Sequence, residues 1–234
     1  GKIVKDYNKD IIFHVDAIQA YGKMRIYPKK MNIDLLSVSG HKIHGPKGTG
    51  FLFIKDKTKI KPLILGGGQQ RAMRSGTENV PGIAGLGKAA ELIYTKDFDE
   101  KVDKMYELRD YFIDRISAEI PYTVLNGHRE DRLPNNINFC FRFVEGESVL
   151  IMLDQAGICA SSGSACTSGA IDPSHVLRAI GLSDEMAHES LRLTLSYENT
   201  KEEIDTVVGE LKRIVERLRG MSPAYKAFLG GEKE

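Results

Sequence analysis

A lysine placed just beyond an apolar run is the residue of this 234-residue chain that most directly suggests chemistry. The run 34–38 reads Asp-Leu-Leu-Ser-Val, which predicts a buried strand, and Ser39-Gly40-His41-Lys42 follows it at once. A lysine beside a serine and a histidine suits a carbonyl-reactive amine next to a site for an anion. The alternative is an ordinary basic turn after an edge strand, so other parts of the chain must decide.

A second polar group follows the apolar run 11–15, where Asp16 ends the run and Gln19 lies three residues later. Ligands of open α/β sheets gather at the carboxyl ends of the strands. A carboxylate there can pair with the protonated ring nitrogen of pyridoxal 5'-phosphate (PLP), the aldehyde cofactor that lysines bind, and Gln19 could contact the ring oxygen. Ser39 and His41 could donate to the phosphate. The alternatives are a helix cap for Asp16 and a loop histidine for His41.

Two other interpretations of the glycine-rich stretch 40–50 are weaker. A nucleotide-binding phosphate loop needs lysine directly after its second glycine, and Pro46 stands there and removes a backbone donor, so we exclude it. Zinc bound by His41, His44 and a cysteine remains a distant alternative, since a His-x-x-His pair alone is weak evidence for a metal.

The three cysteines, Cys140, Cys159 and Cys166, are odd in number and lack metal-type spacing, which argues against a disulfide framework. Cys166 lies in the stretch 161–170, whose other nine residues are Ser, Thr, Gly or Ala. Such a stretch has little apolar surface to anchor it, so we expect an exposed, mobile loop and a reactive thiol. Cys140 and Cys159 lie in apolar, strand-like surroundings and are predicted to be structural.

Arg192 lies inside the alternating run 190–196, which predicts a strand. An arginine in such a run often forms a salt bridge on the polar face. Its guanidinium group also suits a substrate carboxylate, which it can bind through two parallel hydrogen bonds.

The hydrophobic pattern predicts an α/β protein with a boundary near residue 98. Before it we expect a sheet covered on both faces, a loop over 55–78 and a helix over 79–96, and directly after it a helix over 99–119. After it we expect an α+β region that ends in an amphipathic helix, opened by a Thr200–Glu203 capping box. The predicted strands are 11–15, 33–38, 50–54, 122–125, 136–141 and 190–196, and the other predicted helices are 147–155, 173–180 and the final one from residue 200.

Composition limits the class of protein. Hydrophobic residues make up 41% and charged residues 28% of the chain, as in a soluble globular protein, and a net charge of +1 does not favour nucleic acid. No apolar run is long enough to cross a membrane and no signal peptide is recognisable, so we expect a cytoplasmic protein. The opening Gly1-Lys2-Ile3-Val4 lacks a methionine and indicates the continuation of a longer chain, with a strand signal soon after.

Taken together, these residues resemble the cysteine desulfurases, in the NifS/IscS-like branch of the class-V aminotransferases, which are fold-type I PLP enzymes. The resemblance covers essentially the whole chain. It implies that residues 1–98 are the C-terminal part of the parallel-sheet, PLP-binding large domain. Residues 99–234 would form the small α+β domain, with the mobile cysteine loop and the C-terminal helix. It is carried by the motifs His14–Gln19, Ser39–Lys42 with Gly45–Gly48, Arg74–Thr77, Ser161–Thr167 and Leu191-Arg192.

The resemblance also implies a role for each site residue. The enzyme would convert L-cysteine to L-alanine, keep the sulfur as a persulfide on Cys166, and pass it to an acceptor protein. The implied roles are Lys42 for covalent attachment of PLP, Asp16 for its ring nitrogen, Gln19 for its ring oxygen, Ser39 and His41 for its phosphate, Thr77 for the phosphate of the neighbouring subunit's cofactor, and Arg192 for the substrate carboxylate.

The implied partners are L-cysteine, a second copy of the chain in a homodimer, and a sulfur acceptor. That acceptor would be an iron–sulfur scaffold protein or a tRNA-thiolating enzyme, so direct nucleic-acid binding, membrane binding and a resident metal are not expected. Transient contact of Cys166 with an iron–sulfur cluster is compatible with this role.

The sequence also departs from the family pattern. Family members carry a further N-terminal half of the large domain, and Gln70 and Ala72 stand where Glu and Gly are expected. The alternatives are therefore an inactive fragment that serves as a docking module for sulfur acceptors, and a PLP-dependent aminotransferase or lyase of small amino acids.

Overall fold

The computed structural model describes residues 1–162 and 173–231. The chain divides into two compact units, Gly1–Asp99 and Glu100–Glu234, which are described separately below. Their assignment to parts of a large and a small domain stays a prediction.

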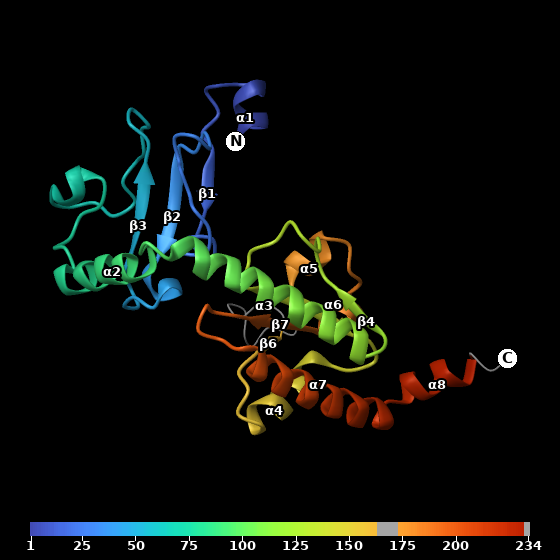
Figure 1. Cartoon of the computed structure of the whole chain (residues 1–234). Helices are drawn as coiled ribbons and strands as arrows, with labels where there is room; N and C mark the ends of the chain where they lie inside the picture. The colour runs from blue at the N-terminus through green and yellow to red at the C-terminus, as the bar shows by residue number, and fades with distance from the viewer. Residues whose placement is uncertain (163–172, 232–234) are drawn as a thin grey trace. The chain divides into compact units, whose positions relative to one another are not determined.

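The first unit contains a three-stranded sheet in the order β1-β2-β3, built from β1 (His14–Asp16), β2 (Leu35–Ser39) and β3 (Gly50–Ile54), as Figure 1 shows. β1 pairs with β2 in parallel, whereas β2 and β3 are antiparallel. The sheet is therefore mixed: the β1–β2 pair agrees with the expected parallel sheet, and β3 departs from it. The connection over residues 40–49 is too short for the crossover that a parallel strand needs, so β3 returns antiparallel.

The core of this sheet is centred on β2, where Leu36 and Val38 are buried together with Ala17 and Ile33. The two neighbouring strands are more exposed. Both end residues of β1 are exposed, and so are three of the five residues of β3. In β2, Leu36 and Val38 are buried on one face, whereas Leu35, Ser37 and Ser39 on the other face are only half-buried. The prediction of strands covered on both faces is therefore not met by any of these three strands. An apolar run by itself does not reveal which strand lies in the middle of a sheet.

The helices of the first unit begin with α1 (Lys2–Tyr7), where the sequence suggested only a strand signal. Two short 3-10 helices follow, η1 (Gly40–Ile43) and η2 (Gln69–Ala72), and then α2 (Val80–Ile93). Asn79 caps α2, because its side chain accepts a hydrogen bond from the Gly82 backbone N–H at 3.2 Å. The predicted helix over 79–96 is confirmed in type and is shorter at its C-terminal end.

One buried carboxylate ties α1 to the sheet. Asp34 is 3% exposed and accepts hydrogen bonds from Lys5 Nζ at 2.5 Å, Lys55 Nζ at 3.0 Å and the Phe13 backbone N–H at 2.9 Å. Burial alone would raise the pKa of Asp34, but the bonds from Lys5, Phe13 and Lys55 outweigh it and hold the pKa far below its ordinary value. The three partners come from segments far apart in the sequence, so this carboxylate joins them.

The second unit contains a four-stranded sheet in the order β4-β5-β7-β6, and each neighbouring pair is antiparallel. Its strands are β4 (Thr123–Leu125), β5 (Asn136–Phe141), β6 (Ser161–Ser162) and β7 (Ser190–Thr194). The prediction of strands over 122–125, 136–141 and 190–196 is confirmed to within two residues at each end.

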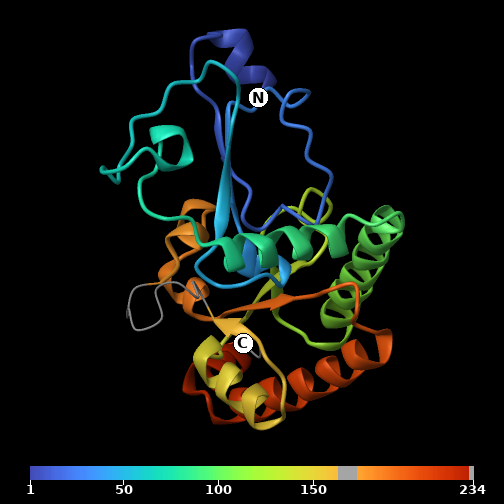
Figure 2. The ribbon, with the colours of Figure 1, turned by 90° about the vertical axis from the view of Figure 1, so that its left-hand side faces the viewer.

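Three helices cover one face of this sheet: α3 (Phe98–Glu119), α4 (Gly146–Gln155) and α7 (Lys201–Met221). Figures 1 and 2 both show α4 and α7 on the same side of β6 and β7. The apolar stripe of α3 is buried as its spacing predicts, and so is that of α7. The strand residues of this core are Ile137, Phe139, Phe141, Leu191 and Leu193.

The predicted capping box of α7 is present. The Thr200 hydroxyl accepts from the Glu203 N–H at 3.2 Å, and Glu203 accepts from the Thr200 N–H at 3.1 Å. The remaining helices are α5 (His175–Ala179), α6 (Asp184–His188) and α8 (Pro223–Gly231), of which the sequence predicted only the first. None of the helices among the described residues is long and apolar enough to cross a membrane.

The two described cysteines differ in burial. Cys140 lies in β5 and is buried, as predicted, whereas Cys159 is exposed, and the expectation of a structural role for it is wrong. Ile158 and Ala160 on either side of Cys159 pack against the core, so the side chain between them points the other way. Cys166 lies outside the described residues.

Replacing Asp34 by asparagine tests its role in the first unit. We expect Asp34→Asn to lower the free energy of unfolding by about 3 kcal/mol at pH 7, because two ammonium groups lose their carboxylate. Because folding lowers the pKa of Asp34, its carboxylate stabilises the fold at pH values above the unfolded-state pKa of about 3.9. The difference in unfolding free energy between the parent chain and Asp34→Asn should therefore shrink as the pH falls below about 4. Urea unfolding followed by circular dichroism measures both.

The matched control is Asp56→Asn, because Asp56 is exposed and forms no ion pair among the described residues. It should leave the free energy of unfolding within about 0.5 kcal/mol of the parent value. Equal stability of the two variants at pH 7 would contradict the role given to Asp34.

Candidate active site

The carboxyl ends of β1 and β2 bring the first group of predicted site residues together. The parallel register pairs Asp16 with Ser37, so Ser39 lies two residues further along the same face. Lys42 follows Ser39 by three residues, in the short helix η1. Asp16 and Lys42 are 26 positions apart in the chain, and the parallel pairing of their strands places both at one edge of the sheet.

A closed loop holds Lys42 between β2 and β3. The Gly40 N–H donates to the Thr49 carbonyl at 2.8 Å, and the Gly45 N–H donates to the Gly40 carbonyl at 2.9 Å. Ile43 is 1% exposed and anchors the loop in the interior of the unit, whereas the side chain of Lys42 is exposed. The backbone of the loop is therefore fixed, and its amine is left accessible.

Two serines of β2 each pair with a histidine. Ser39 Oγ is 2.7 Å from His41 Nδ1, and Ser37 Oγ is 2.7 Å from His14 Nε2. Each hydroxyl fixes the orientation of one imidazole ring, since a ring nitrogen engaged in a hydrogen bond resists rotation. Both histidines are exposed, so each keeps a second ring nitrogen toward solvent.

Asp16 behaves partly as its alternative interpretation predicts. Its Oδ1 accepts a hydrogen bond from the Ile18 backbone N–H at 3.0 Å, which closes the turn that carries Gln19. Tyr94 steadies the far side of this turn, because its hydroxyl accepts from the Gly22 N–H at 3.0 Å. The second oxygen of Asp16 has no partner among the described residues, and a carboxylate can accept several hydrogen bonds at once.

The other predicted site residues lie elsewhere. Thr77 is exposed, in the segment between η2 and α2, and makes no described contact with Asp16, Ser39 or Lys42. Arg192 is half-buried in β7 of the second unit. The structure thus brings together Asp16, Gln19, Ser39, His41 and Lys42 and leaves Thr77 and Arg192 apart from them within the described contacts.

The loop before α2 contains backbone of an unusual kind. Gln70, Arg71 and Ala72 have φ angles of +47°, +56° and +59°, the left-handed region that favours glycine. Ala72 is one of the two positions where the resemblance leads us to expect another residue, here glycine. The departure therefore introduces a residue with a Cβ atom where the backbone suits glycine.

The donor set at the edge of the first sheet fits PLP. An exposed amine can react with the aldehyde, and the hydroxyl of Ser39 and the ring of His41 are donors of the kind that phosphate requires. Asp16 keeps one free carboxylate oxygen for a protonated ring nitrogen.

A comparison of this chain with models of known protein families shows which family it belongs to. The model of the class-V aminotransferases matches residues 1–207, which is most of the chain. The chain belongs to the class-V aminotransferase family. Enzymes of this family use PLP, in agreement with the donor set described above.

The chain is also homologous to cysteine desulfurases within this family. It is 50% identical over 226 residues to cysteine desulfurase IscS of Dictyoglomus turgidum and 49% identical over 223 residues to a cysteine desulfurase of Nostoc sp.. These alignments cover 97% and 95% of this chain but only 56% and 55% of the two relatives. The chain thus spans just over half the length of the curated relatives it matches.

Solved structures agree with the fold. A NifS-like protein from Rickettsia africae superposes with a TM-score of 0.80 at 33% identity, over 92% of this chain and 56% of that one. The apo cysteine desulfurase of Thermococcus onnurineus has a TM-score of 0.77 at 24% identity, with 92% and 55% covered, and supports the fold alone. Both matches show an α/β fold that this chain shares with part of each of these two proteins.

The sequence interpretation missed the pairing of His14 with Ser37 and the polar face of the second sheet. His14 belongs to the motif His14–Gln19, but the spacing of that motif does not identify Ser37 as its partner. A signal for the polar face existed, because Asn136, Asn138 and Cys140 recur at every second residue of β5. The partners of these side chains come from other segments, so spacing alone could not identify them.

A glycine of β3 tests how the Lys42 loop is held. A Cβ atom at Gly50 would overlap the Val38 carbonyl oxygen on the neighbouring strand, and backbone atoms cannot move aside locally. We expect Gly50→Ala to lower the free energy of unfolding by about 1–3 kcal/mol, as overpacking usually does. Urea unfolding measures this change.

The matched control is Gly87→Ala in α2, where an added Cβ meets nothing within 4 Å among the described residues. It should raise stability by about 0.5–1 kcal/mol, since alanine favours a helix over glycine. The same sign of change in both variants would contradict the close approach at Gly50.

Proposed function

We propose that this chain supplies the lysine-bearing and cysteine-bearing parts of a PLP-dependent cysteine desulfurase. In this reaction L-cysteine yields L-alanine, and its sulfur is carried as a persulfide on Cys166. The observation that carries the proposal is the gathering of Lys42, Ser39, His41 and Asp16 at one sheet edge. Identity of about 50% to desulfurases over nearly the whole chain supports it.

The residues of the first unit would hold the cofactor. When bound, PLP withdraws electrons from the carbon atoms of an attached amino acid. Lys42 would bind its aldehyde carbon, Asp16 its ring nitrogen and Gln19 its ring oxygen. Ser39 and His41 would donate to its phosphate. Thr77 would serve the phosphate bound by the neighbouring subunit of a homodimer, which agrees with its separation from the other five residues.

Lys42 would also move protons. When it is not bound to the cofactor, the Lys42 amine would accept a proton from the substrate Cα atom and return it to another carbon. The closed loop around Gly40 and Gly45 keeps the backbone of Lys42 fixed during these steps. The exposed side chain retains the freedom that a shuttle requires.

Cys166 would take the sulfur. Its thiolate would attack the substrate sulfur and form an S–S bond, while the C–S bond breaks and its electron pair stays with the substrate carbon. Protonation of that carbon gives L-alanine. Arg192 would bind the substrate carboxylate through its planar guanidinium group.

The fate of the sulfur is a further part of the proposal. An acceptor protein, either an iron–sulfur scaffold or a tRNA-thiolating enzyme, would remove it from the Cys166 persulfide. The fold-type I assignment, with residues 1–98 as part of a large domain and residues 99–234 as the small domain, belongs to the same proposal, as does a cytoplasmic location.

Lys42→Ala tests the cofactor site. Borohydride reduction of the protein mixed with PLP should fix the cofactor on Lys42 in the parent chain, and peptide mass spectrometry identifies the modified residue. We expect Lys42→Ala to lose this label, because Lys42 is the exposed amine that directly follows the carboxyl end of β2. The control is Lys47→Ala in the same loop, which should keep the label; labelling at another lysine would contradict the assignment.

Cys166→Ala tests the sulfur carrier. We expect the variant to retain the PLP absorbance and to lose alanine formation from L-cysteine by at least about a hundredfold, because the nucleophile is gone. Cys159→Ala is the matched control, since Cys159 is also exposed and should leave alanine formation unchanged. Persistent alanine formation in Cys166→Ala would contradict the role given to Cys166.

A further inference from the structure

The face of the second sheet that carries Arg192 is polar along a continuous row. Asn138 of β5 lies directly opposite Arg192, and Ser161 of β6 lies opposite it on the other side. Directly opposed residues of an antiparallel pair share a face, with Cβ atoms about 5 Å apart. Asn138 and Arg192 are both half-buried. The side chains of Ser161 and Arg192 have no hydrogen-bond or ion-pair partner among the described residues.

In the side-chain amide of Asn138, only the oxygen has a hydrogen-bond partner among the described residues. Its Oδ1 accepts a hydrogen bond from Nδ2 of Asn126 at 2.5 Å. Asn126 is 6% exposed, and its backbone N–H donates to the Asn138 carbonyl at 2.9 Å. The amide nitrogen of Asn138, with two N–H groups, has no partner among the described residues.

A chain of hydrogen bonds fixes which way this amide points. The Met186 carbonyl can only accept, so the Cys140 thiol at 3.0 Å donates its proton to it rather than to Asn126 Oδ1 at 3.4 Å. The Cys140 sulfur then accepts from Asn126 Nδ2 at 3.2 Å, and the second N–H of Asn126 goes to Asn138. Asn138 must therefore present its oxygen inward and its NH₂ group outward.

The protonation of Cys140 supports this direction. Cys140 is fully buried, and burial raises the pKa of its thiol, while the hydrogen bond with Asn126 lowers it by less. The thiol consequently stays protonated at neutral pH and can donate to Met186.

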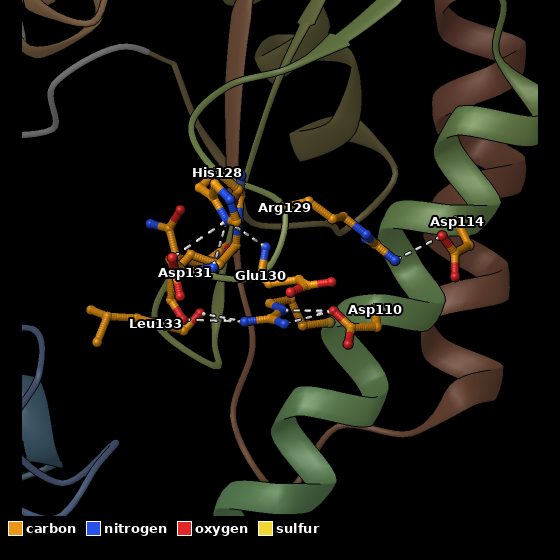
Figure 3. A network of polar contacts seen from close by, with 10 residues as sticks. Asp110, Asp114, His128, Arg129, Glu130, Asp131 and Leu133 are labelled. Carbon is orange, nitrogen blue, oxygen red and sulfur yellow. Dashed lines mark hydrogen bonds and ion pairs between the residues drawn. The ribbon is translucent and has the colours of Figure 1, made fainter.

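The loop between β4 and β5 holds Asn126 from the other side. Arg132 donates to the carbonyls of Asn126 at 2.8 Å and of His128 at 2.6 Å. Figure 3 shows Arg129 of this loop directed at Asp114 of α3, and the two groups are 2.8 Å apart. The loop that begins at Asn126 is therefore joined to α3 by this ion pair.

We infer that Asn138 is a second substrate-binding residue, whose outward NH₂ group donates to the same carboxylate that Arg192 binds. Asn126 and Cys140 are positioning residues that orient this amide. The ligand class is an α-amino acid with a free carboxylate, and the inference rests on the proposed function. A charged donor beside a neutral one also suits a carboxylate better than two guanidinium groups, which would repel each other.

The test compares L-alanine with L-alaninamide, which lacks the carboxylate, as ligands of the chain supplied with PLP. Isothermal titration calorimetry gives the dissociation constant of each. We expect Asn138→Ala to weaken L-alanine binding about tenfold, the usual worth of a hydrogen bond to a charged group, and to affect L-alaninamide far less.

Asn136→Ala is the matched control, because Asn136 lies two residues away on the same face, opposite Thr194, with the same half-buried exposure. It should change neither constant. A second variant, Asn138→Asp, keeps the size of the side chain and should bind L-alanine poorly at pH 7. Its binding should improve as the pH falls toward the ordinary aspartate value of about 3.9, where the carboxyl group becomes a donor.

The positioning residues have their own readout. Cys140→Ala should weaken L-alanine binding, because Asn126 loses the acceptor that orients it. Cys140→Ser should restore it, since a hydroxyl group both donates to Met186 and accepts from Asn126. Equal effects of the two variants would show that Cys140 only fills space.

The outcomes separate this inference from the proposed function. Unchanged L-alanine binding in Asn138→Ala would overturn the inference and leave the proposed function intact. Absence of L-alanine binding in the parent chain, with PLP still fixed on Lys42, would also overturn the inference alone. Failure of the parent chain to fix PLP at Lys42 would overturn the proposed function, and the inference with it.

Discussion

The two-residue alternation of side chains in the second sheet is the constraint on which that unit depends. Because neighbours along a strand point to opposite faces, burying Ile137, Phe139, Leu191 and Leu193 under helices forces the residues between them onto the other face. Arg192 is therefore kept out of the core by the leucines that flank it. The same geometry that builds the core of this unit thus creates its polar face.

Burial has different consequences for the polar groups of this face. Asn126 and Cys140 are almost inaccessible to water, and a buried polar group without a hydrogen bond is costly, by about 1–3 kcal/mol. Each of them is satisfied by a partner from another segment. Because breaking any of these hydrogen bonds would leave a buried polar group without a partner, the side chains adopt one donor–acceptor arrangement. That arrangement ends at the half-buried amide of Asn138.

In the first unit, the main feature is an exposed amine, that of Lys42, on a backbone that is held in place. Lys42 must be exposed to react, yet an exposed residue on a loose loop would lose its position. The loop is short, closes on itself through backbone hydrogen bonds, and is anchored by the buried Ile43. The parallel pairing of β1 with β2 then brings Asp16 to the same edge, and Asp34 ties the N-terminal helix to these strands through its two lysines.

Local sequence determined those elements whose signal lies within one stretch of chain. The Thr200–Glu203 capping box, the apolar stripe of α3 and the run 50–54 each contain their own signal, and the structure agrees with them. The type of residue at the first site could be predicted for the same reason, since serine, histidine and lysine follow a recognisable strand.

Only the tertiary structure decided which segments meet. The antiparallel return of β3, the exposure of Cys159 and the pairing of Asn126 with Asn138 depend on contacts between residues distant along the chain. A hydrophobic pattern gives the period of an element but not its neighbour, its place in a sheet or the face that another segment will cover. Those choices are set by packing and by the need to satisfy buried polar groups, which act across the whole unit.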